Sequence, residues 1–142
     1  MSNIKATELR IGNILSYNTG EENEGWIDCV IDHEDIKWCA ENPESFNNVH
    51  RPILLDKKIF DCFYFNEGNN TYFTRLFDAK HAYSEGEFSI NVQFSISVSL
   101  YYGVMQIGLG EPFLVAPKYA HSLQNTVRYL TGEELAYTPS KK

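Results

Sequence analysis

Apolar and polar residues alternate strictly between positions 88 and 101, which is the clearest pattern in the chain. The apolar positions are Phe88, Ile90, Val92, Phe94, Ile96, Val98 and Leu100. The residues between them are mostly Ser, Asn and Gln. A period of two is typical of an antiparallel strand with one buried and one exposed face. Because strands usually run only about three to ten residues, we expect a bend or a bulge within this one.

A helical period occupies residues 119–131. Its apolar stripe consists of Ala120, Leu123, Val127 and Leu130. Pro117 precedes the stripe and Gly132 follows it, as is common at the two ends of a helix. We therefore expect a helix over residues 119–131, with Leu123 and Val127 buried against the long strand.

Shorter patterns fill the rest of the chain. They predict a short turn that runs into a first strand over residues 7–17, further strands at residues 26–32, 35–39, 71–77, 104–109 and 113–116, and a loop at 41–48. Asp56 is a good N-cap for a short helix that ends near Phe63. The fold class expected is α+β, a twisted antiparallel sheet packed against the C-terminal helix and the short helix. We expect one domain over residues 1–142, made of a strand and hairpin region (9–41), a long-strand sheet (71–116) and the helix (119–131).

Charge is unevenly distributed along the 142 residues, whose net charge is −7. Nine acids lie between positions 21 and 44, namely Glu21, Glu22, Glu24, Asp28, Asp32, Glu34, Asp35, Glu41 and Glu44. Lys37 is the one base there, so this segment carries −8. Two interpretations are open, a solvated face or an acidic patch that binds a basic partner. Direct binding of nucleic acid is disfavoured, because the phosphates would be repelled.

Two polar surfaces with little or no net charge are further candidates for partner binding. His121, Gln124, Asn125 and Arg128 fall on the helix face opposite the apolar stripe. Such a face is ordinarily solvated, but these long hydrogen-bonding groups would also suit a specific contact. The polar positions of residues 89–99 lack charge, and an uncharged strand edge is poorly protected against strand addition. A homo-oligomer formed through that strand is therefore one possibility.

Cysteine and histidine offer little chemistry. Cys29, His33 and Cys39 could ligate zinc, but their spacing matches no standard structural site and a fourth ligand is missing. Cys62 follows Asp61 and precedes aromatic residues, a setting that disfavours a reactive thiolate. The three cysteines are expected to be free thiols, and we expect no catalytic residue, no cofactor and no metal.

Segments near both ends of the chain carry a family resemblance. Leu9-Arg10-Ile11-Gly12-Asn13, His121-x-Leu123-Gln124-Asn125 and Leu130-Thr131-Gly132-Glu133-Glu134-Leu135 resemble a family of small uncharacterised proteins from Bacteroidetes and from their phages and prophages. Arg51-Pro52-Ile53-Leu54-Leu55 is similar to the family's middle segment, although Leu54 replaces a second proline there. The resemblance implies a phage or prophage origin and one compact domain, and it brings no activity.

The leading hypothesis is a phage- or prophage-encoded, non-enzymatic protein–protein interaction module. It would modulate a host nucleic-acid enzyme or defence system through its acidic surface. One alternative is a virion or assembly component, and another is a small nucleotide-binding protein or enzyme that uses the His121 helix face. No apolar run approaches the roughly 20 residues that span a bilayer, and the N-terminus lacks a hydrophobic signal core. We therefore expect no membrane contact and a location in the cytoplasm of the bacterial host cell.

Overall fold

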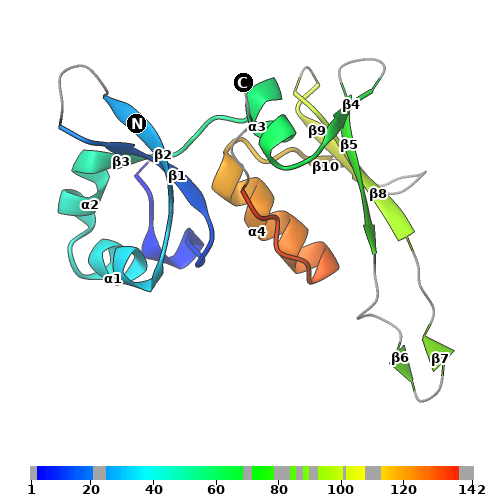
Figure 1. Cartoon of the computed structure of the whole chain (residues 1–142), viewed down its shortest axis with the longest axis horizontal. Coiled ribbons are helices and arrows are strands. Elements are labelled where there is room, and N and C mark those ends of the chain that lie inside the picture. The colour runs from blue at the N-terminus through cyan, green and yellow to red at the C-terminus, as the bar shows by residue number, and fades with distance from the viewer. Residues whose placement is uncertain are drawn as a thin grey trace. The chain divides into compact units, whose positions relative to one another are not determined.

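The computed structural model describes residues 3–20, 25–68, 72–78, 84–85, 88–89, 93–100, 102–107 and 113–137. Helices and antiparallel sheets are both present, so the predicted α+β class is confirmed (Figure 1). The chain divides into two compact units by its internal contacts. Unit 1 comprises residues 1–54 and 118–125, and unit 2 comprises residues 55–117 and 126–142. Among the described residues, no helix is both long and apolar enough to cross a membrane.

Unit 1 contains a small antiparallel sheet whose strand order, in the described part of the chain, is β2-β1-β3. Its strands are β1 (Ile14–Asn18), β2 (Trp26–Val30) and β3 (His50–Arg51). The turn and first strand predicted over residues 7–17 are thus confirmed, and the strand predicted at 26–32 is confirmed in shortened form. Tyr17 on the central strand lies opposite Ile27 on one side and His50 on the other.

A turn and a bulge begin the first strand and explain one glycine of the N-terminal motif. The backbone N–H of Asn13 donates to Arg10 O (3.0 Å), and Gly12 within this turn has φ +95°. Gly12 N–H donates to Ile31 O (2.9 Å), while Ile31 N–H donates to Asn13 O (2.7 Å). Two residues therefore oppose one, as in a bulge that requires a left-handed first residue. Glycine adopts that conformation without the strain of a side chain.

Residues 35–39 form part of a helix, α1 (His33–Glu41), so the strand predicted there is wrong. The start of α1 is fixed by a capping box. Asp35 N–H donates to Asp32 Oδ1 (3.0 Å), and Asp32 N–H donates to Asp35 Oδ2 (3.1 Å). These reciprocal bonds satisfy backbone donors that a helix terminus leaves unpaired. Ile36 and Cys39, three positions apart, then face the core of unit 1.

The loop predicted at residues 41–48 is also wrong, because a second helix, α2 (Pro43–Val49), lies there. Asn42 ends α1 and caps α2, its Oδ1 accepting from Ser45 N–H (3.4 Å). Pro43 occupies the first helical turn, where its missing N–H costs nothing. Local capping therefore outweighed the low helix propensity of the Asn- and Pro-containing segment.

Short apolar segments build the core of unit 1. Its buried residues are Ile4, Leu9, Leu15, Ile31, Cys39 and Phe46. His50 closes the cluster, with its ring stacked on Phe46 at 3.9 Å and edge-on to Trp38 at 5.3 Å. The imidazole Nδ1 lies 2.9 Å from Phe46 O. The extended N-terminal segment and both helices are thereby joined in one core.

Unit 2 is built on a larger antiparallel sheet, whose order in the described residues is β10-β9-β8-β5-β4. The strands are β4 (Asn66–Glu67), β5 (Tyr72–Asp78), β8 (Gln93–Ser99), β9 (Val104–Ile107) and β10 (Phe113–Val115). A separate pair consists of β6 (Ser84–Glu85) and β7 (Phe88–Ser89). The short helix predicted after Asp56 is confirmed as α3 (Lys57–Cys62), with Asp56 Oδ1 accepting from Ile59 N–H (2.9 Å).

The alternating segment contributes to two of these strands, β7 and β8, and residues 90–92 between them lie outside the described residues. Ile96 and Val98 are fully buried while Ser95 and Ser97 are half-buried, which confirms the predicted alternation at these positions. The alternation fails after them, because Ser99 is fully buried and Leu100 is 40% exposed. Residues 96–99 are paired with β5 on one side and with β9 on the other. The expected free edge is therefore wrong for these four residues, because both of their edges are occupied.

The predicted C-terminal helix is confirmed as α4 (Ala120–Thr131). Gly132 follows it with φ +74°, and its N–H donates to Arg128 O (2.8 Å), which ends the helix as expected. Leu123 and Val127 are fully buried, so their predicted burial is confirmed. Residues 120–125 of this helix belong to unit 1 and residues 126–131 to unit 2.

Candidate functional site

The structure brings together two segments that lie near opposite ends of the sequence, residues 8–14 and 121–125. Gln124 Oε1 accepts from Ile14 N–H (2.9 Å), and Gln124 Nε2 donates to Gly12 O (2.9 Å). The Gln124 amide thus pairs with the first strand as a neighbouring strand would. Asn13 Nδ2 donates to Asn125 Oδ1 (2.9 Å), and Asn125 Nδ2 donates to Glu8 O (2.7 Å). We call these side chains of Asn13, Gln124 and Asn125 the polar clasp.

The clasp overturns the expectation of a solvated polar helix face. His121 is 2% exposed and Gln124 is 4% exposed, so neither is available to solvent. Asn125 is half-buried and bonded within the clasp. Arg128, in unit 2, is half-buried, donates to Gly132 O (2.9 Å) and pairs with Glu134 (3.3 Å). The polar groups of His121, Gln124 and Asn125 were misread because their partners lie over a hundred positions away, at the N-terminal end of the chain.

His121 is an unusual member of this region. Its Nε2 lies 3.5 Å from Glu8 Oε1, and its ring stacks on Tyr119 with centroids 5.9 Å apart. Its buried Nδ1 has no hydrogen-bond partner. Burial lowers the pKa of His121, and the Glu8 carboxylate opposes part of that shift. A neutral ring with so little exposure is poorly placed to exchange protons with a substrate.

The acidic residues predicted as a partner surface divide into groups. Asp32 and Asp35 form the capping box of α1, where hydrogen bonds from the backbone of Asp35 lower the pKa of Asp32. Burial raises the pKa of Asp35. Glu34 is exposed and lies 3.1 Å from His33 Nε2. Asp28 is exposed on β2, whereas residues 21, 22 and 24 lie outside the described residues.

The thiols of unit 1 are unsuited to metal binding or nucleophilic attack. Burial, assisted by Asp35, raises the pKa of Cys29 to about 11. Burial also raises the pKa of Cys39, whose Sγ lies 3.6 Å from Ile4 O. The described residues contain no group of three or more potential metal ligands. The three cysteines are free thiols, as the sequence predicts.

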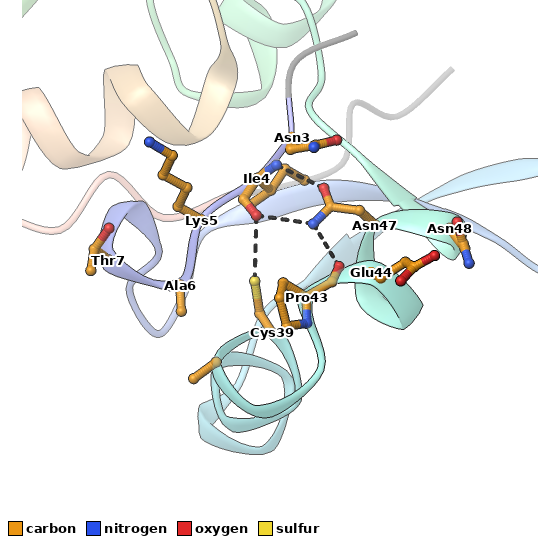
Figure 2. Close-up of a pocket in the computed structure, with 11 residues that line it drawn as sticks. Asn3, Ile4, Lys5, Ala6, Thr7, Cys39, Pro43, Glu44, Asn47 and Asn48 are labelled. Carbon is orange, nitrogen blue, oxygen red and sulfur yellow. Dashed lines mark hydrogen bonds between the residues drawn. The ribbon is translucent and has the colours of Figure 1, made fainter.

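A partly open groove of about 790 Å³ lies in unit 1 between the N-terminal segment and the two helices (Figure 2). Its lining consists of Asn3, Ile4, Lys5, Ala6, Thr7, Cys39, Ala40, Pro43, Glu44, Asn47 and Asn48. Asn47 holds the extended segment in place, because Ile4 N–H donates to its Oδ1 (2.7 Å) and its Nδ2 donates to Ile4 O (3.0 Å). The same Nδ2 also donates to Pro43 O (2.8 Å) one turn earlier in α2, which fixes the Asn47 side chain on its own helix.

Sequence reasoning missed the groove. Its walls are residues 3–7 and residues 39–48, and the second of these ranges was assigned to a strand and a loop. The lining types, small apolar residues and amides, occur throughout ordinary surfaces and give no local signal. The starts of the two helices do have a local signal in the sequence. Asp32 and Asp35 form the capping box of α1, and Asn42 followed by Pro43 marks the start of α2.

No protein-family model, curated protein or solved structure matches this chain. The features available for functional inference are therefore those of the described residues. In unit 1 these are a saturated polar clasp, two buried histidines, exposed acids on α1 and α2, and an apolar groove beside Glu44. The clasp and the histidines are internal, whereas the acids and the groove face solvent.

Proposed function

We propose that this chain is a non-enzymatic protein–protein interaction module that presents an acidic surface to a basic partner. The supporting observation is the exposure of acidic side chains along α1 and α2. We define the acidic surface as the exposed acids of this region, Asp32, Glu34, Glu41 and Glu44. Lys37 is the one base between positions 26 and 49, so little in this segment offsets their charge.

Folding accounts for only part of this acidic surface. Asp32 caps α1, and an acid in the first turn of a helix interacts favourably with the helix dipole, as Glu34 and Glu44 do. Glu41 lies at the C-terminal end of α1, where the dipole of that helix disfavours negative charge. The N-terminus of α2, whose dipole favours negative charge, begins two residues later at Pro43. The unfavourable effect of α1 on Glu41 and the favourable effect of α2 therefore offset each other. Helix stability therefore gives no reason for an acid at Glu41.

A surface of this kind suits a partner with a basic face. Complementary charge mainly accelerates association and excludes partners of like charge. Nucleic acid itself would be repelled, whereas a protein that binds nucleic acid carries the required basic surface. With the phage or prophage origin that the resemblance implies, we propose that the partner is a host nucleic-acid enzyme or a component of a host defence system.

The two alternative functions have less support than the acidic interaction module. A virion or assembly component was suggested by an unprotected strand at residues 89–99, yet residues 96–99 are paired on both edges. A nucleotide-binding protein or enzyme was suggested by an open polar face on the C-terminal helix, yet His121 and Gln124 are buried. Each alternative therefore loses part of the surface on which it depended, whereas Asn125 and Arg128 on the helix are only half-buried.

The test starts with affinity capture from bacterial cells and identification of the captured protein by mass spectrometry. The purified partner is then measured by surface plasmon resonance at low and at physiological salt. Glu41→Lys with Glu44→Lys should slow association about tenfold at low salt, because steering acts on the on-rate. The matched control is Asp61→Lys with Glu133→Lys, two exposed acids of unit 2, which changes the net charge equally.

Charge reversal on α1 and α2 that leaves both rates equal to those of the control would contradict the proposal. The acids would then serve only solubility and helix capping. A binding rate that does not depend on salt would count against it as well, since exposed charges are screened over about 8–10 Å at physiological ionic strength.

A further inference from the structure

The groove in unit 1 lies directly beside the acidic surface. Glu44 belongs to both, since it is exposed on α2 and lines the groove. Glu41, three positions earlier, is exposed at the junction of the two helices. An apolar hollow next to a negative rim is the usual arrangement of an anchoring pocket within a charged interface.

We propose that the groove receives an extended peptide segment of the partner, in which one apolar side chain is adjacent to a basic residue. This inference rests on the proposed function and names the part of the partner that the acidic surface recognises. The apolar side chain would enter the groove, and the basic side chain would lie against Glu44.

The floor of the groove suits an apolar side chain. Ile4 and Cys39 are 2% and 1% exposed, and the small residues Ala6, Ala40 and Pro43 leave the space above them open. The raised pKa of Cys39 keeps its thiol protonated at neutral pH. The contact surface itself comes from Ala6, which is half-buried, and from Ala40 and Pro43, which are exposed, and binding there would exclude water from apolar atoms.

The rim of the groove suits a peptide backbone. The side chains of Asn3 and Asn48 are exposed on it, and an amide both donates and accepts hydrogen bonds as a peptide group does. Lys5 and Glu44 both line the groove, and they lie on opposite sides of the hydrogen-bonded pair Ile4 and Asn47 (Figure 2). Lys5 can donate to carbonyl oxygens of the segment, while Glu44 pairs with its basic residue.

The groove is already held in shape without an occupant. The two bonds between Asn47 and Ile4 fix the extended segment against α2, the bond from Asn47 to Pro43 orients the Asn47 side chain, and Asn47 itself is half-buried. A site formed in advance loses less conformational entropy on binding than a site that must first become ordered. A short segment of a partner could therefore bind this groove with useful affinity.

The test uses a library of random heptapeptides displayed on phage and selected on the full chain. Ala40→Trp fills the groove from α1, and Thr7→Trp fills it from the other side, so a folding defect in one variant does not end the test. Ala136→Trp is the matched control, because Ala136 is an exposed alanine in unit 2. Enriched peptides should pair an apolar residue with Lys or Arg. They should bind either groove variant at least about tenfold more weakly than the control, a change of about 1.4 kcal/mol.

A separate pair of variants tests the proposed contact between Glu44 and the basic residue of the peptide. Glu44→Gln should weaken the enriched peptides several-fold, whereas Glu34→Gln, an exposed acid that does not line the groove, should leave them unchanged. Equal enrichment on the wild type and on both tryptophan variants would overturn the inference. The inference would also be overturned if the enriched peptides lacked basic residues, if they bound at a second site, or if they promoted self-association of the chain.

The same variants separate this inference from the proposed function. If charge reversal at Glu41 and Glu44 slows the captured partner while both groove variants bind it normally, the acidic surface stands and the groove is excluded. If the groove variants lose the partner while charge reversal has no effect, the groove is the binding site for an apolar segment, but the electrostatic proposal and the pairing of a basic residue with Glu44 both fail.

Discussion

Replacing Gln124 by leucine tests the polar clasp, on which the architecture of unit 1 depends. Leucine is close to glutamine in size but can neither accept from Ile14 N–H nor donate to Gly12 O. Ile14 is fully buried, so its N–H would be left without a partner or water. A buried donor in that state costs about 1–3 kcal/mol.

The second bond contributes less. Gly12 is half-buried, so water can replace the lost donor at a cost of roughly 0.5–1.5 kcal/mol. Burial of the apolar leucine recovers part of both losses. We therefore expect Gln124→Leu to lower the free energy of unfolding of unit 1 by about 1–3 kcal/mol.

Tryptophan fluorescence provides an assay specific to unit 1. The chain has two tryptophans, Trp26 and Trp38, and both lie in that unit. With a denaturant slope of about 2 kcal/mol/M, the middle of the usual range for urea, the urea midpoint should fall by roughly 0.5–1.5 M. Tyr129→Leu, at a site on the same helix that is 88% exposed, is the control and should leave the midpoint unchanged.

A midpoint for Gln124→Leu equal to that of the Tyr129→Leu control would refute this reasoning. The Ile14 N–H would then have an alternative partner, and the clasp would not hold the first strand. Amide exchange gives an independent check, because the Ile14 N–H should exchange faster in the variant and remain protected in the control.

Three further predictions follow from the buried groups of the molecule. Burial lowers the pKa of His50, against smaller opposing effects of the Phe46 carbonyl and of Asp35, and it lowers the pKa of His121 against a smaller effect of Glu8. The unfolded chain therefore takes up protons from about pH 6.5 downward before the folded chain does. This contribution to stability is therefore complete above about pH 6.5 and is lost as the pH falls; a urea midpoint that is the same at about pH 7.5 and about pH 5.5 would contradict it. Leu123→Ala should cost about 2–5 kcal/mol of stability by calorimetry, as a fully buried leucine does, and a shift as small as that of a surface variant would show that the site is not packed. Gly12→Ala should cost about 1–2 kcal/mol in urea unfolding because φ is +95° there, although the space around it is open, and an unchanged midpoint would exclude the bulge.

Features with a local cause were predictable from the sequence. The helix after Asp56 follows from one capping residue, and α4 follows from its stripe together with Gly132. The alternation around Ile96 identifies a buried strand because the period of two is uninterrupted there. In each case the deciding interaction lies within a few positions of the residue concerned.

Features that depend on distant partners were not predictable. Ile36 and Trp38 alternate with polar neighbours and imitate a short strand, although the capping box at Asp32 starts a helix. The polar face of α4 looked solvated because Gln124 finds its partners 110 and 112 positions away. The groove combines the segment near Ile4 with two helices, so no single stretch of sequence could reveal it.

Hydrogen exchange of the complex with the captured partner tests the central claim most directly. The acidic surface and the groove occupy residues 3–7 and 32–48 of unit 1. We predict that partner binding slows amide exchange in these two segments relative to the free protein, while the strands of unit 2 exchange as before. Protection confined to unit 2, with exchange at residues 3–7 and 32–48 unchanged, would contradict the account.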